Sequence, residues 1–315
     1  MRNSFMKALE EMTCDHPEIL LMLGDLGFGV VKKFGELYPK QLINAGVAEQ
    51  NMTGMAAGLA LSGKKVFTYS ICNFTTLRPL EFLRNDVAYH NLNVTAVSVG
   101  GGFSYGALGI SHHATEDLAI LRAIPNMTVF APGDTREAYE ITKIIIKEEL
   151  GPVYLRLGRA GEATIHTDET IRHLKVGKIL QVKNDNSKSI ALVSTGGMLE
   201  VASIVHDRLS KVGIPASIYS VHTVKPIDEE KIVEIFDTYD LVFSMEEHTI
   251  IGGLSSAILE CLPGNYNGQI NHFHPFALPP VFTSLVGDQK YLRQNYGISP
   301  ESIFNKVIEK MNLKK

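Results

Sequence analysis

The chain has 315 residues, of which 45% are hydrophobic and 20% charged, and its formal net charge is −4. Lysine and arginine are scattered rather than clustered, which argues against a protein that binds nucleic acid or an anionic membrane. The cysteines Cys14, Cys72 and Cys261 form no CxxC pair, so neither a zinc site nor a disulfide framework is predicted, and a cytoplasmic location is favoured.

Helical and strand patterns alternate over the first half of the chain. This alternation predicts a largely parallel sheet covered by helices on both faces. The expected elements are a helix over 3–13, strands over 19–23 and 43–46, a helix over 49–61, a strand over 65–69, a helix over 77–89, a strand over 94–99, a helix over 116–123, a strand over 127–131, a helix over 135–149 and a strand over 153–157.

A polar stretch over 163–174 separates this half from a second α/β unit. The length also favours two domains, because single cores rarely grow to this size. We therefore expect an α/β protein with domains over 1–165 and 187–315 and a connector over 166–186. In the second unit we expect strands over 189–194, 216–220 and 241–245, and helices over 198–212, 228–239, 252–260 and 299–313.

Glu49 stands where a predicted strand turns into a helix, among alanine, glycine, valine and methionine. Apolar surroundings favour a protonated carboxyl, or one that shares its proton with a ligand nitrogen. The alternative is an ordinary acidic residue in a first helical turn, where the helix dipole favours negative charge. The local pattern alone favours the ordinary interpretation.

Two further groups of residues are candidates for ligand contacts. His112 and His113 follow a glycine-rich loop, and adjacent histidines point apart, so a single histidine in a cleft is favoured over a shared metal ion. The alternative is a surface histidine. Arg156 and Arg159 follow the strand residues Val153-Tyr154-Leu155, at the usual ligand crevice of a parallel sheet, and guanidinium groups suit phosphate. Ordinary surface salt bridges are the alternative.

Taken in order, these segments resemble the C-terminal half of transketolase and of deoxyxylulose-phosphate synthase. The resemblance implies a pyrimidine-binding domain up to about residue 165, followed by the transketolase C-terminal domain. The matching stretches are Ile43 to Gln50, Leu121 to Met127, Ala131-Pro132-Gly133-Asp134 with Glu137, Tyr154 to Arg159, and Glu246-Glu247-His248 with Gly252-Gly253.

On the cofactor side, the resemblance implies that Glu49 hydrogen-bonds pyrimidine N1′ of thiamine diphosphate and so activates the cofactor for attack on a ketose carbonyl. Phe74 matches the aromatic residue that stacks on the pyrimidine, with core packing as its alternative and Tyr69 as the second choice for the stack. Asp25 lies near a family acidic residue beside the cofactor. The sequence Gly24-Asp25-Leu26-Gly27 does not complete a diphosphate–Mg²⁺ motif, so no metal ligand is predicted in this chain.

On the substrate side, His112 matches a catalytic histidine that contacts the sugar, and Arg159 matches the arginine that grips its phosphate. Ser111 and Arg78 are assigned to substrate binding in the same way. Leu108 stands where the family has an aspartate that would bond a sugar hydroxyl. Leucine cannot accept a hydrogen bond, so the donor or acceptor is expected to differ from the usual sugar phosphates.

The family holds the diphosphate and Mg²⁺ in an N-terminal domain that this sequence lacks. We therefore expect a separate N-terminal-type subunit, with thiamine diphosphate and Mg²⁺ at the interface of a heterotetramer in which this chain also self-associates. Met1, followed directly by a helix, favours a natural subunit over an artificial division. Alternatives are a deoxyxylulose-phosphate synthase-like subunit, a 2-oxoacid dehydrogenase β-type subunit, and a degenerate half that only scaffolds or regulates a partner.

Overall fold

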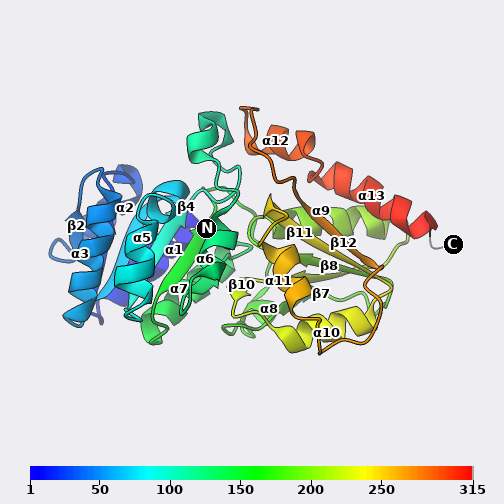
Figure 1. The fold of residues 1–315 in the computed structure, drawn as a ribbon, viewed down its shortest axis with the longest axis horizontal. Helices are drawn as coiled ribbons and strands as arrows, with labels where there is room; N and C mark the ends of the chain where they lie inside the picture. The colour runs from blue at the N-terminus through cyan, green and yellow to red at the C-terminus, as the bar shows by residue number, and fades with distance from the viewer. Residues whose placement is uncertain (314–315) are drawn as a thin grey trace.

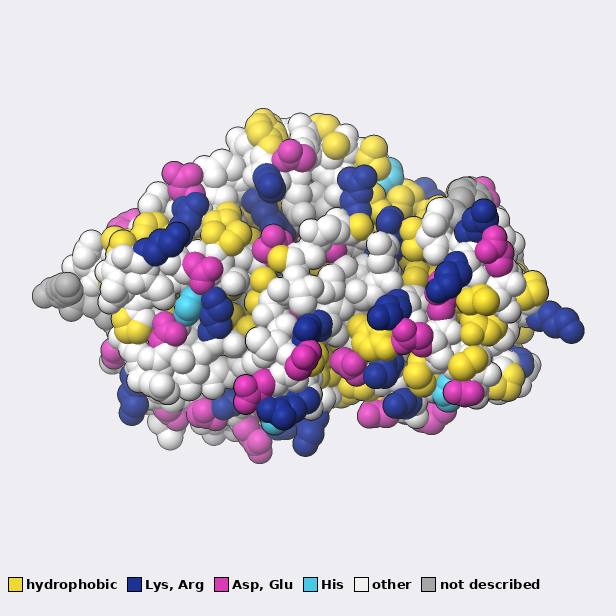
Figure 2. All heavy atoms as spheres, turned by 180° about the vertical axis from the view of Figure 1, so that it is seen from behind, with side chains coloured by type: hydrophobic (Ala, Val, Ile, Leu, Met, Phe, Trp, Pro, Cys, Tyr) yellow, Lys and Arg dark blue, Asp and Glu magenta, His cyan; other side chains and the backbone are white. Residues whose placement is uncertain are grey.

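The computed structural model describes residues 1–313 as two sheets, each covered by helices on both faces (Figure 1). This arrangement confirms the predicted α/β class. On the face drawn in Figure 2, acidic and basic side chains are interspersed. Within residues 1–313, no helix combines the length and the apolar character needed to cross a membrane.

The first sheet has seven strands, and only the edge strand from the second half of the chain runs antiparallel. In sheet order the strands are β10 (Thr223–Lys225), β5 (Thr128–Phe130), β6 (Val153–Leu157), β4 (Val94–Val99), β3 (Lys65–Ile71), β1 (Ile19–Leu23) and β2 (Leu42–Asn44). The central strands are buried on both faces, which is why they appear in the sequence as continuous apolar runs.

Alternate residues of the central strands face two helical layers. Leu21 of β1 packs in the cluster that holds Phe5 and Phe34, whereas Met22 packs in the cluster of Met52 and Ala56. The first layer comprises α1 (Arg2–Thr13), α2 (Phe28–Leu37) and α7 (Thr135–Lys147), and the second comprises α3 (Glu49–Leu61), the segment from 72 to 88 and α6 (Asp117–Ala123).

The helix expected over 77–89 is wrong in its bounds. The chain instead forms α4 (Cys72–Thr76), α5 (Leu80–Phe82) and a π-helical turn, η1 (Leu83–Ala88). Pro79 explains the break, because proline has no N–H to donate and disfavours helical geometry at the residue before it. That residue is Arg78, whose N–H bonds the carbonyl of Asn73 at 3.3 Å. Arg78 therefore stands on a bend.

The second sheet has five strands with β7 as its antiparallel edge. Its strands, in order, are β12 (Phe273–Leu278), β11 (Leu241–Thr249), β8 (Ile190–Ser194), β9 (Ser217–Ser220) and β7 (Leu180–Lys183). Its helices are α9 (Met198–Lys211) and α13 (Pro300–Leu313), which share one hydrophobic cluster, and α10 (Glu229–Thr238) and α11 (Leu254–Glu260), which share another. In chain order, the short helix α8 (Asp168–Ile171) lies between the last strand of the first half, β6, and β7.

The two halves of the chain are joined through strand β10, which pairs with β5 and so completes the first sheet with residues from the second half. The side chain of Lys225 reinforces this joint by donating to the carbonyl of Arg122 at 2.9 Å. The strand patterns did not predict β7, β10 or β12, and α2 and α12 (Gln289–Asn295) were also missed. Strands β7 and β10 have only four and three residues, which is too short for a clear period, and β12 contains Pro275, a residue that is unfavourable within a strand.

Candidate active site

Glu49 is the first residue of α3 and is only 3% exposed, although it carries a carboxylate. It lies against the end of β1, because a Cβ added to Gly24 would meet the Glu49 side chain at 3.4 Å and Ser70 Oγ at 3.2 Å. Ser70 Oγ is buried and has no hydrogen-bond partner. A carboxylate and a hydroxyl without a partner thus both face the small backbone of Gly24.

Arg78 and Phe74 stand beside this carboxylate. One guanidinium nitrogen of Arg78 donates to both oxygens of Glu49, at 3.1 and 3.0 Å. The same guanidinium lies over the ring of Phe74, 3.8 Å from its centre. Phe74 belongs to α4, so the break before Pro79 brings a ring, a cation and a buried acid to one place.

His112 continues the site from the other side of Phe74. The two rings meet edge to face, with their centres 5.3 Å apart. His112 ends η3 (Ile110–His112), and its Nδ1 lies 2.9 Å from Ser111 Oγ. The side chain of Asn73 holds this loop by donating to the carbonyls of Ser111 at 3.1 Å and His113 at 2.9 Å.

Burial lowers the pKa of His112, and the nearby His113 and the positive charge of Arg78 lower it further. At neutral pH the imidazole is therefore held in its neutral form, with one nitrogen free to accept a proton. This is the protonation state required of a general base or a hydrogen-bond acceptor. The contact with Ser111 orients the ring.

Arg159 completes the row at the surface. Its guanidinium lies 5.4 Å from the ring centre of Tyr105, and that ring lies 6.5 Å from the ring of His112. Arg159 is exposed and follows β6, as the sequence predicted. The structure therefore links Glu49, Arg78, Phe74 and His112 into one series of contacts, which Tyr105 continues to Arg159.

Two predicted cofactor residues lie apart from this series. Tyr69 is 1% exposed and stacks on Phe5 in the core, and burial raises the pKa of its hydroxyl well above the usual value. Of the two candidate aromatic rings, only that of Phe74 joins the series of contacts from Glu49 to Arg159. Asp25 is exposed at the end of β1 and accepts a hydrogen bond from Asn44 Nδ2 at 3.0 Å. Residues 1–313 contain no cluster of three His, Cys, Asp or Glu side chains able to hold a metal ion.

Arg156, expected at the ligand crevice beside Arg159, is instead buried in an ion pair. Its Nε donates to Asp117 Oδ2 at 2.6 Å and its Nη2 donates to Oδ1 at 3.2 Å. Nη2 also donates to the carbonyls of Ala114 and Glu247, so the guanidinium connects the two domains. For Arg156 the structure therefore matches the salt-bridge alternative, except that its pair with Asp117 is buried rather than at the surface.

The segment Glu246-Glu247-His248 supports the site from the second domain. Glu246 accepts from the backbone N–H groups of Leu254 and Ser255 at the start of α11. Glu247 accepts from the N–H of Phe103 at 2.5 Å, in the glycine loop that leads to His112. The sequence marked this segment only as part of a resemblance, because Phe103, which donates to Glu247, lies 144 residues earlier in the chain.

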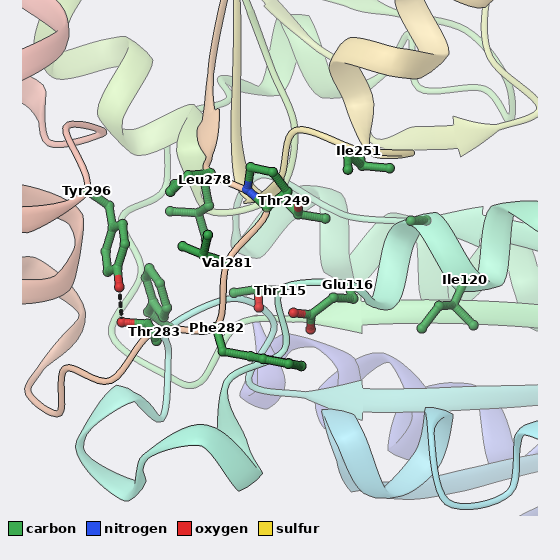
Figure 3. Close-up of a pocket in the computed structure, with 14 residues that line it drawn as sticks. Thr115, Glu116, Ile120, Thr249, Ile251, Leu278, Val281, Phe282, Thr283 and Tyr296 are labelled. Carbon is green, nitrogen blue, oxygen red and sulfur yellow. Dashed lines mark hydrogen bonds between the residues drawn. The ribbon is translucent and has the colours of Figure 1, made fainter.

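A separate cavity of about 410 Å³ lies between the domains and shares no lining residue with the series from Glu49 to Arg159 (Figure 3). Its walls are mostly apolar and include Phe103, Ile251, Val281 and Phe282. Glu116 points into it near Phe282. The cavity is therefore a second, distinct hollow at the domain boundary.

Comparison with known proteins shows that both halves of the chain match transketolase domains. The family model for the transketolase pyrimidine-binding domain matches residues 1–161, and that for the transketolase C-terminal domain matches residues 177–303. A putative transketolase C-terminal section of Methanocaldococcus jannaschii is 37% identical, with 99% of this chain and 96% of that protein covered.

Two further relatives also match along nearly their whole length. One of the subunits of an apulose-4-phosphate transketolase from Phocaeicola vulgatus is 32% identical, with 98% of this chain and 96% of that protein covered. A solved structure described as a split-gene transketolase, inactive β4 tetramer, superposes with a TM-score of 0.87 at 32% identity, with 100% of this chain and 99% of that chain covered.

Proposed function

Since this chain belongs to the transketolase family, we propose that it is the C-terminal subunit of a split, thiamine-diphosphate-dependent enzyme that transfers a two-carbon ketol unit between sugars. The observation that carries this proposal is the unbroken series of contacts from buried Glu49 to exposed Arg159. A scaffold has no need for a buried acid, an aromatic ring and a neutral histidine in one row.

The residues around Glu49 suit a pyrimidine ring. The carboxyl is buried, the backbone beside it is kept small by Gly24, and Ser70 Oγ is a buried polar atom without a partner. Phe74 offers an aromatic face next to the acid. When bound, thiamine diphosphate supplies a nucleophilic carbon and an electron sink for the two-carbon fragment.

Each residue of the chain has its own task in this proposal. Glu49 holds a proton at pyrimidine N1′, and Phe74 supports the ring. His112, kept neutral by burial, accepts a hydrogen bond or a proton at the sugar, while Ser111 orients its imidazole. Arg159 binds an anionic group, such as the phosphate of a sugar phosphate, at the mouth of the site.

The diphosphate and Mg²⁺ are assigned to an N-terminal-type partner subunit. One relative is named as a C-terminal section and another as one of several subunits, and both are covered almost completely by this chain, which supports this division. We further propose a heterotetramer of two copies of each subunit. The β4 assembly of the solved relative supports self-association through this type of subunit.

The test is ketol transfer by this chain mixed with an N-terminal-type subunit, thiamine diphosphate and Mg²⁺. With a ketose phosphate donor and an aldose phosphate acceptor, Glu49→Gln should lower kcat by at least about a hundredfold, since proton-holding groups contribute on this scale. Glu81→Gln, an exposed change on α5, is the control and should leave kcat unchanged.

The same mixture separates the alternatives. Turnover only with pyruvate as donor would replace ketol transfer by a deoxyxylulose-phosphate synthase-like condensation, and decarboxylation of a 2-oxoacid would indicate a dehydrogenase β-type subunit. Absence of cofactor uptake in calorimetry, with the partner present, would favour a scaffold. A Glu49→Gln enzyme with the wild-type kcat would refute the assigned role of Glu49.

A further inference from the structure

Arg78 occupies the centre of the candidate site. It is ion-paired with Glu49 through both carboxylate oxygens, and it covers the ring of Phe74 at 3.8 Å. Its charge is also one of the causes that lower the pKa of His112. No other described cation makes a contact of this kind with Glu49 or Phe74 within residues 1–313.

The places taken by Arg78 are the ones that a pyrimidine ring requires. A ring that hydrogen-bonds Glu49 through a nitrogen needs the carboxyl oxygens that Arg78 now engages. A ring that stacks on Phe74 needs the face on which the guanidinium now lies. One aromatic face and one carboxyl cannot serve both groups at once, so the two occupancies exclude each other.

The position of Arg78 allows its side chain to change orientation. Arg78 lies on the bend between α4 and α5, outside regular helix, and its side chain is 45% exposed whereas that of Glu49 is 3% exposed. An ion pair with one partner this exposed is weak, because water competes for the guanidinium. The backbone of the bend is held by hydrogen bonds from Leu77 and Arg78 to Asn73, so the side chain can turn away without unfolding the turn.

We propose that Arg78 is a latch on the cofactor site: it occupies the Glu49–Phe74 pair, and entry of the pyrimidine ring displaces it toward the mouth of the site. There its guanidinium joins Arg159 in meeting an anionic substrate. This inference rests on the proposed function. If Arg78 is such a latch, cofactor binding must break the Arg78–Glu49 ion pair and the contact of Arg78 with Phe74. The affinity for the cofactor is lower for that reason.

The experiment is calorimetric titration of thiamine diphosphate, in the presence of Mg²⁺, into the complex of this chain with its N-terminal-type subunit. Arg78→Met removes the charge but keeps a long side chain. It should lower the Kd for the cofactor by about three- to tenfold, the range that a half-exposed ion pair plus a cation–π contact supports. Arg78→Lys retains the charge without the planar group, and its Kd for the cofactor should lie between those of the wild type and Arg78→Met.

The matched control is Arg84→Met, which removes the same charge from the next helical turn, where Arg84 is exposed and its side chain donates to Asn85. It should leave the Kd unchanged. In steady-state assays, Arg78→Met should also raise KM for a phosphorylated acceptor while it tightens the cofactor, a combination that simple damage to the site does not produce. Melting curves of all variants verify that the fold is retained.

The outcomes separate this inference from the function on which it rests. If the wild-type complex binds the cofactor and Arg78→Met binds it equally or more weakly, the latch is refuted and the proposed function stands. If only Arg78→Met binds, the latch is supported in its strongest form. If no variant binds, the cofactor assignment fails and the latch fails with it.

Discussion

Replacing Asp117 by asparagine would leave Arg156 charged and without its counter-ion inside the protein. The ion pair is deeply buried, with side-chain exposures of 1% for Asp117 and 6% for Arg156. The asparagine keeps the shape of the side chain and can still accept one hydrogen bond. The change therefore isolates the charge and leaves packing nearly intact.

The expected loss is about 3–5 kcal/mol of unfolding free energy, because breaking one side of a buried pair leaves an uncompensated charge in a poorly polarisable interior. The hydrogen bonds that Tyr154 donates to Asp117 and that Arg156 donates to the carbonyls of Ala114 and Glu247 persist. They are the reason to expect a loss within this range rather than complete unfolding.

The pH dependence gives a second signature. Burial opposes ionisation of Asp117, but the charge of Arg156 and, to a smaller degree, that of His248 outweigh it and hold the pKa of this carboxyl below its usual value. A depressed pKa stabilises the fold above the unfolded-state value near 3.8 and loses that contribution as the pH falls through the folded-state value. The wild type should therefore lose its advantage over Asp117→Asn below about pH 4.

The assay is urea unfolding followed by circular dichroism at 222 nm, between pH 3 and pH 7. The matched control is Asp168→Asn, which removes the partner of Arg136 from an ion pair in which Asp168 is 97% exposed. The control should cost less than about 1 kcal/mol. If Asp117→Asn lowers the free energy of unfolding at pH 7 by no more than the control does, the buried Asp117–Arg156 pair does not stabilise the contact between the domains.

Two further predictions concern Gly102, at the joint between the domains, and His166, at the start of the connector. Gly102 has φ 64° and a Cβ there would overlap a carboxylate of the second domain, whereas Gly213 has φ 74° and open space around it. In urea unfolding, Gly213→Ala should lower the free energy of unfolding by about 1 kcal/mol because of backbone strain. Gly102→Ala should lower it by at least about 1 kcal/mol more, because its Cβ also overlaps the carboxylate. Equal losses for the two variants would contradict the close approach at Gly102. Burial disfavours the charged form of His166, but its 2.7 Å hydrogen bond to Glu137 outweighs this and raises its pKa. A raised pKa stabilises the fold below the unfolded-state value of about 6.5, and this contribution is lost as the pH rises through the folded-state value. The difference in unfolding free energy between wild type and His166→Gln should therefore be widest near pH 6 and shrink toward pH 9. A gap that stays constant over this range would exclude the ion pair.

Local patterns were sufficient for most of the fold. The helix over 49–61 and the strands over 19–23, 94–99 and 153–157 have the bounds that the sequence predicts, because each is clearly patterned and is followed by glycine or a polar residue. The helix expected over 77–89 failed where Pro79 interrupts an otherwise helical pattern. Strand β10 could not be predicted, because its partner strand β5 lies almost a hundred residues earlier.

The sequence alone placed Glu49 at a strand-to-helix turn and put His112 and Arg159 in the order of one family, since these features depend on local spacing. Only the tertiary structure distinguished the environments of residues of the same type. Arg156 is buried between the domains and Arg159 is exposed at the surface, because only Arg156 meets the buried charge of Asp117. The tertiary structure likewise showed that Arg78, expected as a substrate ligand, pairs with Glu49, since burial and charge pairing are set by contacts between distant parts of the chain.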